Sequence, residues 1–522
     1  MRPRSPGSQR PTQAPRPAPS RAFSSSLPAD EKGTSVRAVP LILMLLAAAG
    51  STRPAAAQGQ PSSANRGQPS RTSSQGPQTS LPMSTFLGGV PAGTATDRVE
   101  TLTLVGVIAR ALEHNLGILT AEQGLGRAQG ARWRALSEML PDINGRISET
   151  RQQINLQAFG FSRFGSAFSD VPTIVGPFNV FDARIFVSQS VLDFGAINGA
   201  RAEAHHLEAA RYTYKGARDF VINVAGNLYV QALAAAARSE AALAQQQTAQ
   251  TLYTQAVDLK QNGLVAGIDV LRAEVQLSTQ VQRSTIASND LEKARLQLAR
   301  AIGLPLGQKF ALDPTLPELP AADLSIEDAV NRAYAARPDY QAALERVRAA
   351  EAERQAVIGN AQPSLKVTAD YGDIGLSPGD SRGTFSVGGA VTIPIFQGGR
   401  TRGRLLEADA DLRNRRAEAD DLKASIYYEV RTAFLDLDAT SRQLALAGRA
   451  RDLAAQQLTQ ARDRFAAGVA SNIEVVQAQD AVAVASEQFI AARYGYDLAK
   501  GALIRGVGAT EDALRQLLGG VR

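Results

Sequence analysis

An internal duplication is the feature that most constrains how this chain of 522 residues can fold. Four short sequence blocks occur once in each half of the chain, in the same order and at similar spacing. The clearest block is Gly263-Leu-Val-Ala-Gly-Ile-Asp-Val-Leu, which returns 205 residues later as Gly468-Val-Ala-Ser-Asn-Ile-Glu-Val-Val. The other three pairs begin at Leu102 and Leu324, at Ser190 and Pro394, and at Leu298 and Leu503. Because a duplicated unit repeats one supersecondary structure, we predict two structurally equivalent halves.

Each copy contains two segments with the alternating pattern of a half-buried strand. Residues 365–371 (Leu-Lys-Val-Thr-Ala-Asp-Tyr) alternate strictly between apolar and polar, so the two faces of this strand differ in character. Between the two strands of each copy lies a loop rich in Gly, Ser, Asp and Pro, with about 18 extra residues in the first copy. The predicted strands are 143–153, 183–192, 365–371 and 385–393, and the predicted loops are 157–178 and 372–382.

Helical periodicity follows each pair of strands. Residues 196–259 contain no proline, and apolar residues such as Val221, Val224 and Leu228 recur at the spacing of one helix face. A helix of this length would be roughly 95 Å long at 1.5 Å per residue. Each copy is therefore predicted to run helix, strand, loop, strand, long helix, glycine turn, return helix. The long and return helices are expected at 196–259, 268–301, 400–467 and 473–504.

A secretory signal is predicted near the N-terminus. Lys32 and Arg37 precede the apolar run 38–49, and cleavage is expected after Ala57. The run has about half of the roughly 20 residues that cross a bilayer, so a retained anchor is the weaker alternative. Residues 58–98 are rich in Ser, Gln, Gly and Pro and are expected to be flexible. No stretch after the signal is predicted to reach the length of a transmembrane helix, so strands would have to cross any membrane.

Charge and composition argue against several protein classes. Residues 1–57 carry eight Lys and Arg against two acidic residues, which accounts for the whole formal charge of +6. We therefore expect no nucleic-acid partner, since a nucleic-acid-binding protein keeps its positive charge in its folded part. The chain has no cysteine, three histidines and no nucleophile or phosphate-binding motif, so we expect no metal, no cofactor and no enzymatic activity. The arginine-rich stretch 400–416 also contains acidic residues and is interpreted as a solvated helix face.

The element order and the repeated phrases resemble the TolC-like outer membrane efflux protein family over residues 100–510. The phrases that begin at Gly263 and Gly468 carry the resemblance, together with Pro394-Ile-Phe-Gln-Gly-Gly-Arg. The resemblance implies a membrane α+β fold in which a homotrimer closes a twelve-stranded β-barrel, four strands per chain, continued by a long periplasmic α-helical barrel. Association is also expected physically, because four strands leave two open edges and known membrane barrels need at least about eight strands.

The resemblance also assigns a role to the two glycine turns. It implies that a periplasmic adaptor protein docks on both turns. The alternative is that the glycines are simply C-caps that join two helices. The docking residues implied are Gly263, Leu264 and Val265 in the first copy, and Gly468, Val469 and Ala470 in the second.

Two acidic residues follow the turns at equivalent positions. The resemblance implies that Asp269 and Glu474 form rings at the periplasmic entrance. The alternative is that each is a first-turn acid that stabilises a helix N-terminus. The family's second acid, one helical turn further on, is missing, because Arg272 and Gln477 stand there. Arg272 could instead pair with Asp269 at i+3.

The function implied is an outer-membrane channel subunit that provides a passive exit duct for efflux or type I secretion. Its partners would be a periplasmic adaptor, an inner-membrane pump and outer-membrane lipid. The alternative is a soluble periplasmic coiled-coil scaffold without a pore. The expected segments are the signal with its N-terminal extension (1–57), a flexible segment (58–98), the first repeat (99–310), a linker (311–323) and the second repeat (324–518).

Overall fold

The computed structural model describes residues 83–159, 172–316, 325–467, 469–510 and 513. All of them belong to the compact unit that spans Pro77–Arg522. The predicted signal and its cleavage position lie outside the described residues, as do Gly468 and most of the segment expected to be flexible.

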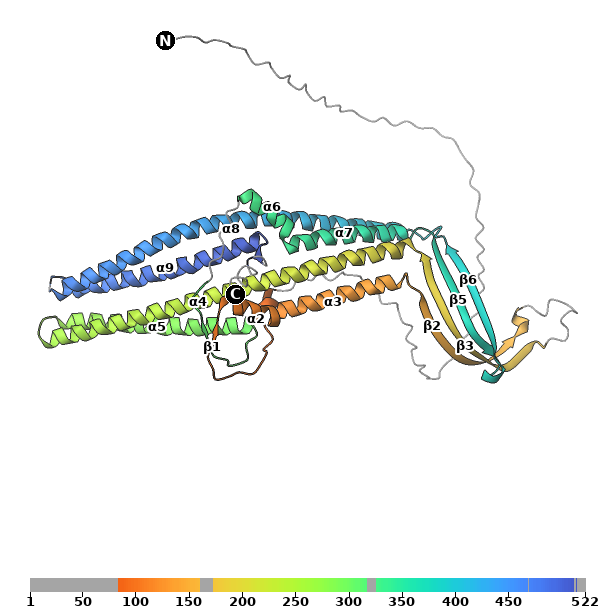
Figure 1. Cartoon of the computed structure of the whole chain (residues 1–522), viewed down its shortest axis with the longest axis horizontal. Helices are drawn as coiled ribbons and strands as arrows, with labels where there is room; N and C mark the ends of the chain where they lie inside the picture. Colours follow the sequence, from red (N-terminus) through yellow and green to blue (C-terminus); the bar gives the residue numbers. More distant parts are fainter. Residues whose placement is uncertain (1–82, 160–171, 317–324, 468, 511–512, 514–522) are drawn as a thin grey trace, which may run out of the picture. The chain divides into compact units, whose positions relative to one another are not determined.

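The two halves of the chain have the same order of elements (Figure 1). The first half contains α2 (Leu104–His114), α3 (Leu116–Ser137), β2 (Asp142–Asn155), β3 (Ile174–Leu192), α4 (Phe194–Gln261) and α5 (Gly267–Ala301). The second half contains α6 (Ile326–Ala336), α7 (Pro338–Gly359), β5 (Ser364–Gly375), β6 (Arg382–Thr392), α8 (Arg400–Ala466) and α9 (Asn472–Gly506). The remaining elements are short: α1 (Met83–Phe86), β1 (Glu100–Leu102), η1 (Leu156–Phe159), β4 (Phe310–Leu312) and η4 (Pro378–Asp380).

The helix expected before each strand pair is in fact two helices. In the first half the break lies at Asn115, whose side chain accepts a hydrogen bond from the Gly117 N–H and donates to the Phe86 and Ala301 carbonyls. In the second half it lies at Arg337, just before Pro338, because a residue that precedes proline avoids helical backbone angles. The sequence analysis missed both breaks.

The strands extend further than the alternating patterns indicated. β3 begins at Ile174 and β5 continues to Gly375, so both strands enter ranges that were expected to be loops. The long and return helices lie close to their predicted ranges, with α4 and α8 spanning 68 and 67 residues. At 1.5 Å per residue, each of these two helices is about 100 Å long.

The four long strands form one antiparallel sheet in the order β2–β3–β5–β6. The helices α3, α4, α7 and α8, which each connect directly to one of these strands, pack side by side in the same order. The two halves therefore meet through β3 and β5 in the sheet and through α4 and α7 in the helical layer. Among the described residues, β2 and β6 each pair with a single long strand, so both edges of the sheet are open.

Each half has its own apolar core. The first is built by α2, α4 and α5 around side chains such as Val107, Tyr229 and Leu298, and the second by α6, α8 and α9 around Ile426 and Val430. The helix α4 also contains an 18-residue window of mean hydropathy 1.5, long and apolar enough by composition to cross a membrane, and half of that window is buried within the protein. The expectation that no later stretch meets this test is therefore wrong.

Candidate functional site

The sheet has two faces of opposite character. Its register pairs odd with odd and even with even positions over most of its length, so each parity lies on one face. The odd face carries most of the large apolar side chains that are exposed in the single chain, together with Glu149, Arg151 and Asp373. The even face is mainly polar and charged, and also carries Val180 and Phe186. The exposed apolar residues of the odd face are Ile143, Ile147, Ile185, Val367, Tyr371, Phe385, Val387 and Val391.

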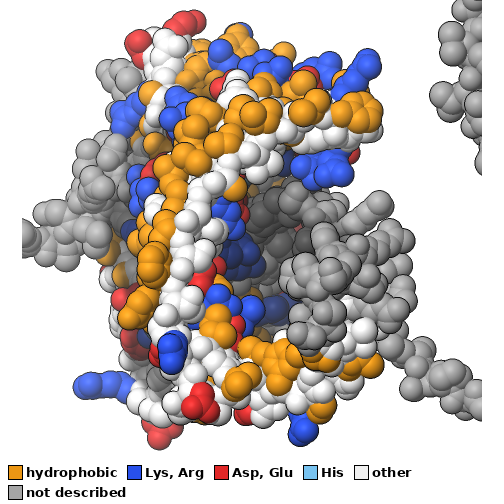
Figure 2. Space-filling model, turned by 90° about the vertical axis from the view of Figure 1, so that its right-hand side faces the viewer, with side chains coloured by type: hydrophobic (Ala, Val, Ile, Leu, Met, Phe, Trp, Pro, Cys, Tyr) orange, Lys and Arg blue, Asp and Glu red, His pale blue; other side chains and the backbone are white. Residues whose placement is uncertain are grey.

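Figure 2 views the end of the molecule that carries the sheet, and hydrophobic side chains form a long band across it. A water-soluble protein seldom exposes so many adjacent large apolar side chains. An apolar band on one face of the strands and polar groups on the other is the arrangement of membrane strands that surround an aqueous interior.

At the far end of α4, the chain turns through a glycine cap. Gly263 has φ +74°, and its N–H donates to the Lys260 carbonyl, while the Leu264 N–H donates to the Leu259 carbonyl. These two bonds form a Schellman motif, which ends a helix with a residue in the left-handed region. At the end of α8 the Val469 N–H donates to the Arg464 carbonyl in the equivalent bond. The C-cap interpretation of the Gly263 turn therefore holds, and docking remains a separate question.

The two turns present apolar side chains to solvent. Leu264 is 71% exposed and Val469 is 68% exposed. Val265 and Ala470, the next residue in each turn, are half-buried. Since the cap needs only the backbone, neither exposed side chain is required for the turn itself.

The acidic residues after the turns each have a basic partner. Asp269 lies 3.2 Å from an Arg272 nitrogen, which confirms the expected pairing, and its side chain is 21% exposed. Glu474 lies 3.4 Å from an Arg464 nitrogen of α8. Both acids also stand in the first turn of a helix, so the stabilising role at a helix N-terminus fits the geometry as well.

The first turns of α5 and α9 are joined directly. The Asn472 side-chain amide donates to the Asp269 carbonyl at 3.0 Å, and Asn472 is 5% exposed. Two turns further on, the Gln276 amide donates to Asp480 at 3.2 Å. The structure therefore places Asp269 and Glu474 at one end of the same helix cluster. The sequence analysis did not single out Asn472 or Asp480, because nothing local indicates a partner some 200 residues away.

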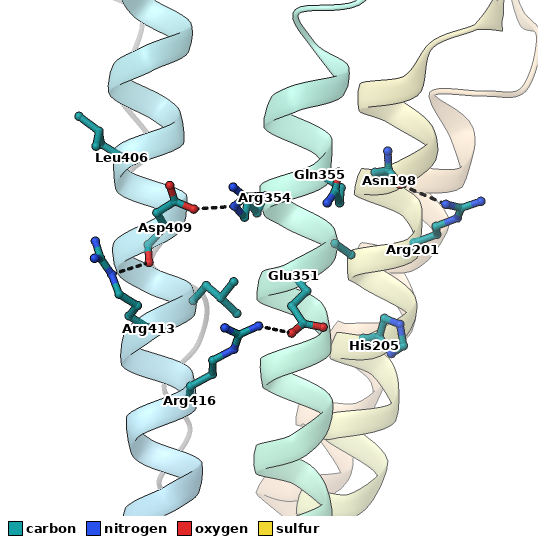
Figure 3. A pocket seen from close by; sticks show the side chains of 12 residues that line it. Asn198, Arg201, His205, Glu351, Arg354, Gln355, Leu406, Asp409, Arg413 and Arg416 are labelled. Atoms are coloured by element: carbon teal, nitrogen blue, oxygen red, sulfur yellow. Dashed lines mark hydrogen bonds and ion pairs between the residues drawn. The ribbon is translucent and has the colours of Figure 1, made fainter.

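A groove of about 850 Å³ lies between α4, α7 and α8 (Figure 3). Arg416 pairs with Glu351 across this groove, and Arg354 pairs with Asp409. Arg416 therefore joins α8 to α7, although it is 56% exposed. Arg400, Arg402, Arg404 and Arg413 are also exposed, as expected of a solvated helix face. Beside the groove, His205 contacts Glu345, and His206 contacts Glu353, each at 2.8 Å. Both histidines thus join α4 to α7.

Known proteins share this arrangement. A family model described as outer membrane efflux protein matches residues 107–304 and 329–509, one segment in each half of the chain. The chain belongs to the outer membrane efflux protein family. It is thus a channel protein of the outer membrane that serves efflux, and the alternative of a soluble periplasmic scaffold is set aside.

Individual relatives of this outer membrane efflux protein are distant in sequence. The pyoverdine export outer membrane protein OpmQ of Pseudomonas putida is 22% identical over 396 residues, covering 73% of this chain and 80% of the relative. The outer membrane protein TolC of Escherichia coli is 24% identical, covering 61% of this chain and 67% of TolC. The crystal structure of the Campylobacter jejuni CmeC outer membrane channel superposes with a TM-score of 0.69 at 18% identity, covering 83% of this chain and 94% of CmeC. The predicted TolC-like fold is confirmed.

Proposed function

We propose that three copies of this outer membrane efflux protein close one twelve-stranded barrel, and that their helices continue the channel through the periplasm as a passive exit duct. The observation that supports closure of a barrel by several copies is the open-edged sheet with one apolar and one polar face. The number three is the one that the resemblance to TolC-like channels implies. Unpaired strand edges cannot lie in lipid, because their backbone N–H and C=O groups would have no partners there. Closing β2 of one copy onto β6 of the next would pair both edges. It would also turn the odd face toward lipid and the even face toward water.

The turns after α4 and α8 are proposed as the docking surface for a periplasmic adaptor that links the duct to an inner-membrane pump. The surface comprises Gly263, Leu264, Val265, Gly468, Val469 and Ala470. The exposure of Leu264 and Val469 supports it, since apolar side chains at a turn that does not need them are available to a partner. Asp269 and Glu474, which follow these turns, are proposed to line the entrance at the same end.

Small-molecule export is proposed as the first cargo class to test. Two relatives are named for pyoverdine export and for efflux, which favours this class over secretion of a protein by a type I system. In a passive duct, the choice of cargo belongs to the pump.

The docking proposal is tested by the double variant Leu264→Asp/Val469→Asp. These changes leave the backbone caps intact and place a charge on each exposed apolar tip. We expect co-purification with the adaptor to fall by roughly tenfold or more, as for other central interface residues, and export to fall with it. Leu306→Asp is the matched control, because Leu306 is an 85% exposed leucine after the end of α5. Wild-type binding and export in the double variant would place the docking surface elsewhere.

A further inference from the structure

One row of the even face contains two arginines and no carboxylate. The register aligns Arg146 of β2 with Arg184 of β3, Arg184 with Gly372 of β5, and Gly372 with Thr384 of β6. This arginine row crosses the whole sheet. Over the four strands, the even positions hold four basic residues against three acidic ones, an excess of one positive charge per chain. The basic residues are Arg146, Arg184, Lys366 and Arg382, and the acidic ones are Asp142, Asp182 and Asp370.

Arg184 is held within the chain by two carboxylates, and these three side chains together carry a net charge of −1. Its Nε and Nη2 donate to the two carboxylate oxygens of Asp182 at 2.7 and 2.6 Å, and its Nη1 donates to Asp370 at 2.9 Å. Its paired neighbour in the row has to be glycine, because a side chain on Gly372 would collide with the Ala183 carbonyl. Arg184 therefore links β3 to β5, and its guanidinium is occupied by these two carboxylates.

Arg146 is different, because its side chain is exposed and forms no ion pair, although its charge acts on Asp182 from beyond ion-pair distance. Its guanidinium carbon lies 5.4 Å from the centre of the Phe186 ring, and Arg184 lies 5.0 Å from the same ring. In the part of the chain that the structure describes, no carboxylate lies within ion-pair distance of Arg146. Association does not supply one from the neighbouring strand, since β6 contains neither Asp nor Glu.

We infer that Arg146 makes the lumen of the barrel attract anionic solutes, such as carboxylates, phosphates and sulfonates. The inference rests on the proposed function, in which the even face lines the channel and three copies form a ring. Each copy adds one guanidinium that stays charged at any physiological pH. Rings of Arg or Lys select anions in other pores. The barrel would then favour anions although the proposed entrance at Asp269 and Glu474 is acidic.

The electrostatic potential near Arg146 can be measured with a reactive group at position Asn144. It is exposed on the even face, two residues from Arg146 on the same strand, about 7 Å away. That distance is shorter than the screening length of about 10 Å at 0.1 M salt. The chain has no cysteine, so Asn144→Cys provides a single reactive thiol. Reaction from outside the cell needs no open periplasmic entrance, which keeps the acidic rings out of the measurement.

The experiment compares the reaction rates of this thiol, in outer-membrane channels, with an anionic and a cationic methanethiosulfonate. We expect the anionic-to-cationic rate ratio to fall about threefold or more when Arg146→Gln is added. The reason is that the variant removes the Coulomb energy between the reagent and one positive charge at this distance. Arg146→Lys should keep the ratio, and so should Arg151→Gln, which removes a charge from the odd face of the same strand. In Asn144→Cys with Arg146 intact, raising the salt concentration should lower the anionic-to-cationic rate ratio toward the value for a small thiol in solution, because salt screens the charge of Arg146.

The outcomes separate the two proposals. A thiol that reacts with neither reagent would show that the even face does not line an open lumen, which contradicts the proposed function. A reactive thiol whose ratio depends neither on Arg146 nor on salt would overturn the role of Arg146 and leave the channel proposal standing.

Discussion

Buried polar side chains fix where the helices of this outer membrane efflux protein break and how they join. Arg337 is 5% exposed, donates to Asp339 and Glu429, and also reaches the Gly506 carbonyl of α9. Burial opposes ionisation of Asp339, but hydrogen bonds and charge attraction from Arg337 outweigh burial and hold its pKa below the usual range. One side chain thereby holds the α6–α7 break against α8 and α9. Pro338 is a local signal for this break that the sequence analysis overlooked, whereas no local signal indicates the distant partners of Arg337.

His206 is expected to make the contact between α4 and α7 depend on pH. The hydrogen bond with Glu353 raises the pKa of His206 above its ordinary value of 6.5, and the charge of Glu353 adds to this effect. A raised pKa means that the protonated form is favoured in the folded state. Its stabilising contribution is therefore fully present below about pH 6.5 and is lost as the pH rises through the raised pKa.

The measurement is the thermal midpoint of the detergent-extracted protein between pH 5 and pH 8, for wild type and His206→Gln. The wild type should gain stability relative to the variant as the pH falls. The difference should be small, because both side chains are partly exposed. Parallel pH curves for the two proteins would show that the pair contributes nothing.

At the scale of elements, the sequence predicted the bounds of the long helices better than the ends of the strands. The long and return helices were predicted to within a few residues, because their apolar spacing and the interrupting glycines are local signals. The strand ends were not, since the alternation fades where β3 begins at Ile174 and where β5 ends at Gly375. Residues there keep their strand conformation through hydrogen bonds to neighbouring strands, which a single-strand pattern does not contain.

The two faces of β6 should respond differently to a lysine. Phe385 is 75% exposed on the odd face, and Thr384, its neighbour in sequence, lies on the even face. Phe385→Lys would place an ammonium group against lipid, at a cost of about 2–4 kcal/mol near the middle of the bilayer. Thr384→Lys would place the same group in water and is the matched control.

The readout is the yield and heat resistance of the oligomer extracted from the outer membrane. We expect Phe385→Lys to lower both and Thr384→Lys to leave them near wild type. Equal damage from the two variants, or damage from Thr384→Lys alone, would mean that the faces are assigned the wrong way round.

At the scale of the whole molecule, the duplication is what made the fold predictable. Matched phrases such as those at Gly263 and Gly468 indicate equivalent elements, and their order determines which helix leads into which strand. The sequence does not contain the packing of one half against the other. Contacts such as Asn472 with Asp269, and His206 with Glu353, join segments that no local pattern relates. The residues of the proposed entrance and the Asp269–Arg272 pair were therefore named from the sequence, but the contacts between α5 and α9 were not.

The proposed entrance rings make a prediction about ion selectivity. Asp269→Asn/Glu474→Gln should lower the K⁺ over Cl⁻ permeability ratio of channels in planar bilayers, because it removes two negative charges per chain. Arg272→Gln should raise the ratio, since Arg272 lies 3.2 Å from Asp269 and offsets its charge. Reversal potentials in a KCl gradient measure both effects. An unchanged ratio in the double neutralised variant would place the narrowest part of the duct away from these residues.

The native mass of the protein extracted from the outer membrane tests the channel architecture most directly. Light scattering with the detergent contribution subtracted gives the number of chains in each particle. We predict three chains, the number that the resemblance to TolC-like channels implies, and their twelve strands would close a barrel with every sheet edge paired. A monodisperse monomer that stays soluble when the detergent is removed would contradict this architecture, since the open edges and the exposed odd face would then have no membrane to enter.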